Sequence, residues 1–161
     1  MHTESLQRER AMNYFYEFFP KRALQETIVL RVEQEDPLPE GDYLLSECYC
    51  INVNCHCYNT IIQAQRHQQN RLEAPIATML YCWKKPLSKH NPFLLADAQQ
   101  TPWAETVRNM FCEHLESHPE YSKMLSEHYK AMREKARKLA KINSVCPCSS
   151  GRKFKKCCLL R

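Results

Sequence analysis

Eight cysteines fall into two groups of four, and cysteine thiolates are the side chains best suited to hold a soft metal ion or to do redox chemistry. The first group lies within residues 48–57 and the second within residues 146–158, which leaves only Cys82 and Cys112 outside them. The first ten residues are polar and charged, so we expect a cytoplasmic, reducing setting in which clustered cysteines bind metal or react rather than form disulfides. Two groups of four predict two tetrahedral sites.

The second group has the pattern C-x-C-x8-C-C and consists of Cys146, Cys148, Cys157 and Cys158. Each closely spaced pair can present two thiolates, and Gly151 in the intervening loop permits the chain to reverse and bring the pairs together. Zinc suits four sulfur ligands because it demands only a tetrahedral arrangement. So short a segment buries too little apolar surface to fold alone, and zinc would supply the folding energy, roughly 10–16 kcal/mol in zinc-finger peptides.

These residues resemble the SEC-C motif, which occurs at the C-terminus of the protein-translocation motor SecA and on many other bacterial proteins. The likeness covers residues 146–161 and rests on both cysteine pairs, the Ser-Gly step and the basic-aromatic-basic stretch that follows it. The resemblance implies a structural zinc, with Cys158 at a position that the family fills with Cys or His. In SecA the motif also contacts the chaperone SecB and the ribosome, so the resemblance implies such partners here.

The first group, Cys48, Cys50, Cys55 and Cys57, has the pattern C-x-C-x4-C-x-C. Alternate residues of an extended chain share a face, and the Asn-Val-Asn segment between the pairs favours a turn, so a hairpin would point four sulfurs at one place. We interpret this group as a second structural zinc site. A site that uses His56 in place of one cysteine and a redox-active thiol cluster are the alternatives. The segment also resembles, more loosely, a cysteine-rich strand in some uncharacterised bacterial SEC-C proteins.

The elements that would position these cysteines belong to an α+β fold. Hydrophobic periodicity predicts an antiparallel meander, with the first cysteine group at the hairpin between its second and third strands; the strands are expected at 26–34, 43–50, 57–65 and 75–83. Helices are expected at 5–19, from an N-cap at Thr101 to about Ser117, and from Pro119 to about Lys141. The last two helices would lie antiparallel on one face of this small sheet.

Basic charge is concentrated at the C-terminal end of the chain. Residues 130–161 hold eleven Lys or Arg and one acidic residue, a net charge of +10, whereas the remaining 129 residues carry a net charge of −5. We therefore divide the chain into an α+β core domain, 1–141, and a zinc minidomain, 142–161. Its candidate partner-binding residues are Arg152, Lys153, Phe154, Lys155 and Lys156. The four cations among them carry more charge than the 2− of a zinc tetrathiolate. This excess predicts docking of an acidic protein surface, a ribosome or RNA.

The remaining residues argue against common enzyme chemistries. With only Gly41 and Gly151, the chain cannot form a phosphate-binding loop, a dinucleotide-binding turn or a nucleophile elbow, and no apolar run reaches the length of a membrane span. His114 and His118 are spaced like a metal-binding pair but lack the HExxH pattern, and we interpret them as histidines near a helix end.

The sequence thus predicts a zinc-binding interaction or adaptor protein. A thiol-based redox protein and a nucleic-acid-binding protein are the alternatives. No residue is assigned a catalytic role, and Cys82 and Cys112 are expected to be packed thiols.

Overall fold

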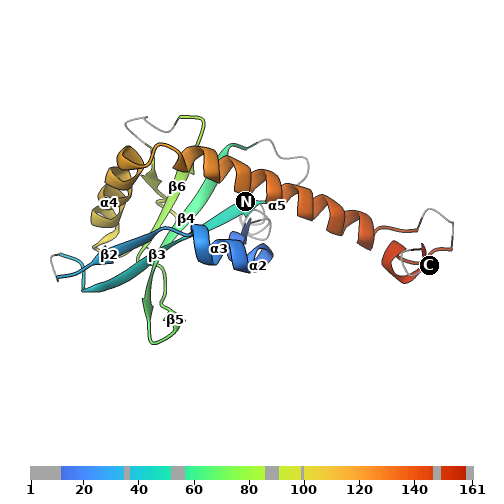
Figure 1. Cartoon of the computed structure of the whole chain (residues 1–161), viewed down its shortest axis with the longest axis horizontal. Coiled ribbons are helices and arrows are strands. Elements are labelled where there is room, and N and C mark those ends of the chain that lie inside the picture. The colour runs from blue at the N-terminus through green and yellow to red at the C-terminus, as the bar shows by residue number, and fades with distance from the viewer. Residues whose placement is uncertain are drawn as a thin grey trace.

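The protein is described by a computed structural model at residues 12–34, 37–51, 57–85, 91–98, 100–146 and 150–158. In these ranges an antiparallel sheet of seven strands is packed by four helices, which confirms the predicted α+β class (Figure 1). The strands are β1(Met12–Tyr14), β2(Val29–Val32), β3(Gly41–Cys50), β4(Asn59–Gln68), β5(Arg71–Leu72), β6(Ala77–Cys82) and β7(Phe93–Leu94). The helices are α2(Phe15–Phe18), α3(Pro20–Glu26), α4(Ala104–Ser117) and α5(Tyr121–Asn143), followed by a single 3-10 turn η1(Phe154–Lys156).

The centre of the sheet is the predicted meander, in the order β2, β3, β4, β6. Strand β3 is long enough to pair with two strands along one edge: β2 lies along its first half, with Val29 opposite Leu44, and β1 lies along its last residues, with Met12 opposite Cys50. Its other edge pairs with β4. The connection between β3 and β4 is the segment of the first cysteine group, as expected, although residues 52–56 lie outside the described ranges.

The helices pack on one face of this sheet and form the core with it. Glu47, Ile62 and Met79 share that face because they stand opposite one another across β3, β4 and β6. Phe111 of α4 packs edge-on against Tyr81 of β6, with ring centroids 5.8 Å apart. Each large apolar side chain that is fully buried here contributes about 1.5–3 kcal/mol, so apolar burial between the sheet and its helices stabilises the core.

The beginning of the chain differs from the prediction of one helix over residues 5–19. Residues 12–14 form β1, because their backbone groups complete hydrogen bonds along the edge of β3. Pro20, expected to end a helix, instead begins α3, since the first helical position needs no N–H donor. The part of this prediction that concerns residues 5–11 lies outside the described residues.

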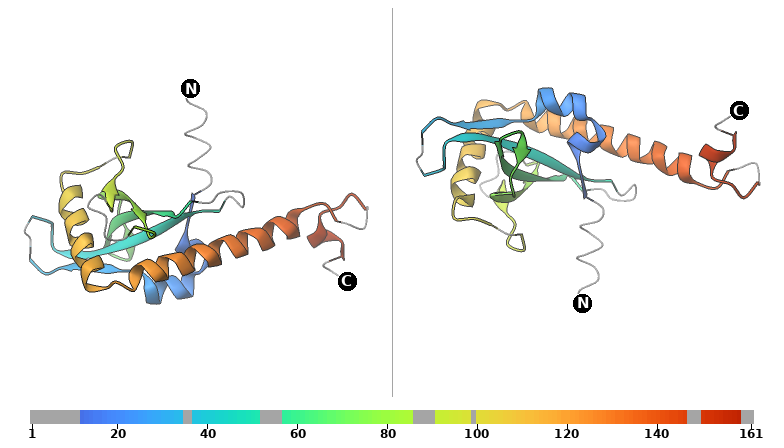
Figure 2. Two further views of the ribbon diagram at one scale, coloured as in Figure 1. Left: turned by 90° about the horizontal axis from the view of Figure 1, so that it is seen from above. Right: turned by 90° about the horizontal axis from the view of Figure 1, so that it is seen from below.

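Two expectations for the second half of the chain were also wrong. Thr101 is not an N-cap: its hydroxyl donates to the Ile76 carbonyl at 2.7 Å, and α4 begins three residues later. Helix α4 does not run antiparallel beside α5 but points in a clearly different direction (Figure 2). Helix α5 extends beyond the sheet and carries η1 at its far end. Within the described residues, no helix combines the length and apolar character needed to cross a membrane.

Candidate metal centre

The segment after α5 folds back on itself as a short hairpin. The Phe154 N–H donates to the Ser144 carbonyl at 2.9 Å, and the Cys146 N–H donates to the Arg152 carbonyl at 2.7 Å. Val145 and Lys153 form the antiparallel bridge between the two arms. The backbone thus places Cys146 on one arm opposite the start of η1 on the other.

Gly151 stands at the turn of this hairpin. Its φ is +70°, a left-handed conformation that side chains of L-residues rarely adopt, and no atom lies within 4 Å of where a Cβ would stand. The requirement for glycine is therefore one of backbone conformation rather than of space. Beside it, the Ser150 hydroxyl accepts the Arg152 N–H at 3.3 Å and lies 3.3 Å from the Cys157 sulfur.

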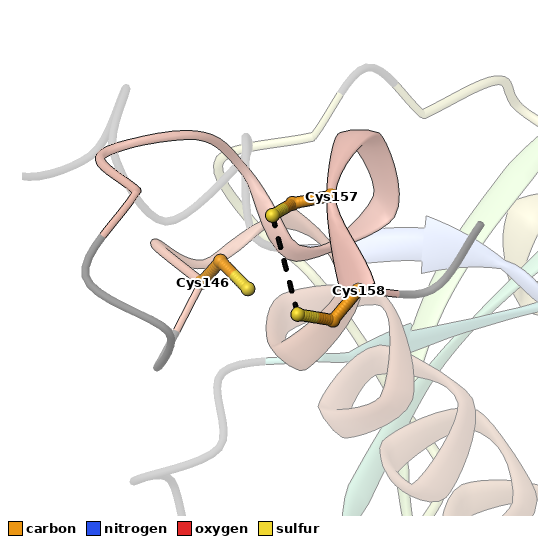
Figure 3. A group of neighbouring side chains, drawn as sticks. All are labelled: Cys146, Cys157 and Cys158. Atoms are coloured by element: carbon orange, nitrogen blue, oxygen red, sulfur yellow. Dashed lines mark hydrogen bonds between the residues drawn. The ribbon is translucent and has the colours of Figure 1, made fainter. Parts of the chain in front are cut away.

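Three sulfurs converge where the hairpin meets η1, as Figure 3 shows for Cys146, Cys157 and Cys158. All three lie within 4.8 Å of one another, and the sulfurs of Cys157 and Cys158 are 4.0 Å apart. Tetrahedral zinc with bonds of about 2.3 Å requires its sulfurs to be about 3.8 Å apart. Three of the four predicted ligands are therefore close to the spacing of a zinc site. The fourth, Cys148, lies outside the described residues.

The family comparison agrees with this geometry, because residues 143–160 match the family model of the SEC-C motif. The chain carries a SEC-C motif. We call residues 142–161 the SEC-C module. No curated protein and no solved structure matches the chain, and the family match lies within the SEC-C module.

The basic side chains of the SEC-C module lie on its surface. Arg152, Lys153, Lys155 and Lys156 are exposed, and none of them forms an ion pair within the described chain. Phe154 is half-buried at the start of η1, and its role in partner binding stays a prediction. The module thus presents cations around its sulfur cluster.

The first cysteine group is arranged differently. Cys48 and Cys50 lie on β3 and share a face by alternation, whereas Cys57 precedes β4. Among the described residues, only the SEC-C cysteines form a group close enough to hold a metal, so Cys48, Cys50 and Cys57 do not converge in this structure. Cys55 and His56 lie outside the described residues, and a second zinc here stays a prediction.

Burial also bears on the redox alternative for this group. Cys48 is only 6 % exposed, and burial raises the pKa of its thiol to about 12. A free thiol of that kind is a poor nucleophile at neutral pH. The other histidine and cysteine candidates show no metal group among the described residues: the rings of His114 and His118 stack at 4.2 Å, and Cys82 and Cys112 are half-buried.

Sequence reasoning missed a buried polar cluster between β3, α3 and α5. The His128 Nδ1 lies 2.6 Å from the Glu47 carboxylate, and its Nε2 hydrogen-bonds Glu26. Glu47 also accepts hydrogen bonds from the hydroxyls of Tyr49 and Tyr121 at 2.7 and 3.2 Å. The available signal was Glu47 itself, a charged residue on the same face of the strand as Leu45 and Tyr49, which are large and apolar.

Proposed function

We propose that the protein is a zinc-binding interaction protein whose SEC-C module docks an acidic partner, such as a chaperone or the ribosome. The observation that carries this proposal is the sulfur cluster of Cys146, Cys157 and Cys158, whose spacing fits zinc. Zinc would hold the hairpin in shape, and the hairpin presents exposed cations to solvent. One zinc is expected here, and a second at Cys48, Cys50, Cys55 and Cys57.

The electrostatics of the SEC-C module favour an acidic partner. A zinc bound by four thiolates carries a formal charge of 2−, and Arg152, Lys153, Lys155 and Lys156 exceed it by two positive charges. These cations are not neutralised by ion pairs within the described chain. Exposed charge of one sign accelerates encounter with an oppositely charged surface and makes binding depend on salt.

The place of the SEC-C module in the molecule also favours docking. Helix α5 carries it beyond the sheet, so that the core does not surround it (Figures 1 and 2). The residues that join the two, 137–141, are exposed on every side of the helix. A large partner can therefore approach the SEC-C module without colliding with the core.

Titration of the zinc-loaded protein tests this proposal. Fluorescence anisotropy of the labelled protein is measured against ribosomes and, separately, against an acidic chaperone, each at two salt concentrations. We expect binding to at least one partner that weakens with salt, and the Lys155→Gln/Lys156→Gln protein to bind at least about tenfold more weakly. The matched control, Lys21→Gln/Lys123→Gln, removes the same charge from exposed positions of the core. Absence of salt-sensitive binding to both partners would refute the proposal.

A ligand substitution tests whether zinc shapes the docking surface. Cys146→Ser removes one of the converging sulfurs and is expected to lower the zinc content by one ion per chain and to weaken docking together with it. Cys112→Ser is the control, because Cys112 lies on α4 away from the sulfur cluster. Docking that survives loss of this zinc would show that the basic residues act without the folded SEC-C module.

A further inference from the structure

A second basic site lies on the core, where Tyr58, the residue before β4, faces helix α5. It is a cleft of about 250 Å³ lined by Tyr58, Tyr129, Lys130, Arg133 and Arg137. No carboxylate is present among the described residues that line it. The SEC-C module, residues 142–161, contributes none of the lining residues, so this cleft is distinct from the zinc site.

One cation of the cleft is fixed in place. Arg133 is only 7 % exposed, and its Nη1 donates to the Tyr129 hydroxyl at 2.5 Å. The guanidinium carbon lies 5.3 Å from the centre of the Tyr129 ring, and that ring packs against Trp83 at 5.1 Å. Arginine keeps its charge at any physiological pH, so the cleft has a permanent, oriented cation in its wall.

Tyr58, which also lines the cleft, has a further cation against its ring. Tyr58 is 41 % exposed, and the Lys84 ammonium lies 3.2 Å from the centre of its ring. Tyr58 is held at its backbone, because its carbonyl accepts the N–H of Trp83. Four cations thus lie near the rings of Tyr58 and Tyr129: Lys84, Lys130, Arg133 and Arg137.

The basic residues of the cleft continue along α5. Lys130, Arg133, Arg137 and Lys141 recur at spacings of three and four residues, so they lie on one side of the helix. From Lys130 to Lys141 this row spans about 17 Å at the rise of an α-helix. Glu134, the acidic residue of this stretch, pairs with Lys138 at 2.8 Å. The row is therefore longer than one phosphate group requires.

We propose that this cleft and the row beyond it bind single-stranded nucleic acid, with phosphates on the exposed Lys130, Arg137 and Lys141 and a base against the exposed Tyr58 ring. Planar guanidinium groups match phosphate oxygens, and bases stack on aromatic side chains whatever their sequence. An acidic peptide would use the cations but gain nothing from the tyrosine. This inference does not depend on the SEC-C module, which supplies none of the residues of the cleft.

The test measures fluorescence anisotropy of a labelled ten-nucleotide oligouridine titrated with the full-length, zinc-loaded protein. Lys130→Gln/Arg137→Gln is expected to weaken binding at least tenfold and to reduce the dependence of log K on log salt by about 1.4, because two phosphate contacts on a single strand are lost. Lys123→Gln/Lys138→Gln removes the same charge from α5 outside the cleft and is expected to change affinity less than threefold. Tyr58→Ala is expected to weaken binding about fivefold or more with an unchanged salt slope.

The outcomes separate nucleic acid from other polyanions. A labelled polyglutamate peptide of equal charge is titrated in parallel, and we expect it to bind more weakly and to be insensitive to Tyr58→Ala. Equal affinity for both probes, or equal losses in the two double variants, would overturn the proposal, as would undetectable oligouridine binding. The Lys155→Gln/Lys156→Gln protein should keep its cleft-dependent binding even if docking through the SEC-C module fails.

Discussion

At the scale of single residues, the least expected feature is a histidine held between two carboxylates in the core. His128 is buried, with Glu47 on Nδ1 and Glu26 on Nε2, and the Phe15 ring stacks on it at 3.9 Å. Burial lowers the pKa of His128, but the hydrogen bonds and charges of the two carboxylates outweigh it and raise that pKa above 6.5. Burial likewise raises the pKa of Glu26, but hydrogen bonds from His128 and Arg22 outweigh it and lower that pKa below 4.5.

This cluster predicts a pH dependence of stability. Because the pKa of His128 is raised by folding, its contribution is complete below about pH 6.5 and is lost as the pH rises through the folded value. The contribution of Glu26 is complete above about pH 4.5 and is lost as the pH falls through its lowered folded value. We therefore expect the free energy of unfolding in urea to decrease from pH 6.5 to pH 9. His128→Gln should flatten this decrease, whereas substitution of the exposed His67 by Gln should leave it unchanged.

The loss of stability expected for His128→Gln follows from the carboxylate that this substitution leaves unpaired. Removing it strands the Glu47 carboxylate in the core, which costs about 3–5 kcal/mol. Tyr121→Phe is the milder variant: it deletes one hydrogen bond to Glu47, costs about 1 kcal/mol and keeps the pH dependence. A wild-type stability that does not change between pH 6.5 and pH 9 would contradict this account of the cluster.

At the scale of elements, the turn of the SEC-C hairpin leads us to predict how strongly the module binds zinc when Gly151 is substituted. Gly151→Ala places a side chain in a left-handed conformation, which costs about 1 kcal/mol, and so should weaken zinc binding about fivefold in a competition with a chelator. Gly151→Asn should lose less, because asparagine tolerates this conformation. If both variants bind zinc as tightly as the wild type, the turn is not what limits assembly of the site.

The elements also show what could be predicted from the sequence. The strands of the meander were predictable because their alternation is local. The convergence of Cys146, Cys157 and Cys158 was predictable because their spacing is a property of one short segment. Strand β1 was not predictable, because it forms by pairing with residues far away in the sequence. Met12 stands opposite Cys50. The contact of His128 with Glu26 joins residues 102 positions apart, a distance over which no local pattern operates.

At the scale of the whole molecule, the core and the SEC-C module are joined by one helix, and we expect different forces to stabilise them. The buried apolar cluster of the described chain ends at Met132, well before the first SEC-C cysteine, Cys146. The core thus rests on apolar burial, whereas the SEC-C module is expected to rest on zinc. We therefore expect residues 1–141 to fold without residues 142–161.

Truncation after Ser144 tests both this division and the number of zinc sites. Elemental analysis is expected to give two zinc ions per full-length chain and one per truncated chain, and the thermal midpoint of the core should change by less than a few degrees. The control is full-length protein carried through the same purification. A single zinc that disappears on truncation would refute the site at Cys48, Cys50, Cys55 and Cys57.

The protruding end of α5 fixes the direction in which the SEC-C module faces. Each residue of an α-helix adds about 1.5 Å and turns the chain by about 100°. Deleting one residue among the exposed positions 137–141 would therefore leave the zinc hairpin almost as far from the sheet but facing another side of the molecule. For a partner that touches both the core and the SEC-C module, we therefore expect length changes in this linker to be tolerated only in steps close to whole helical turns.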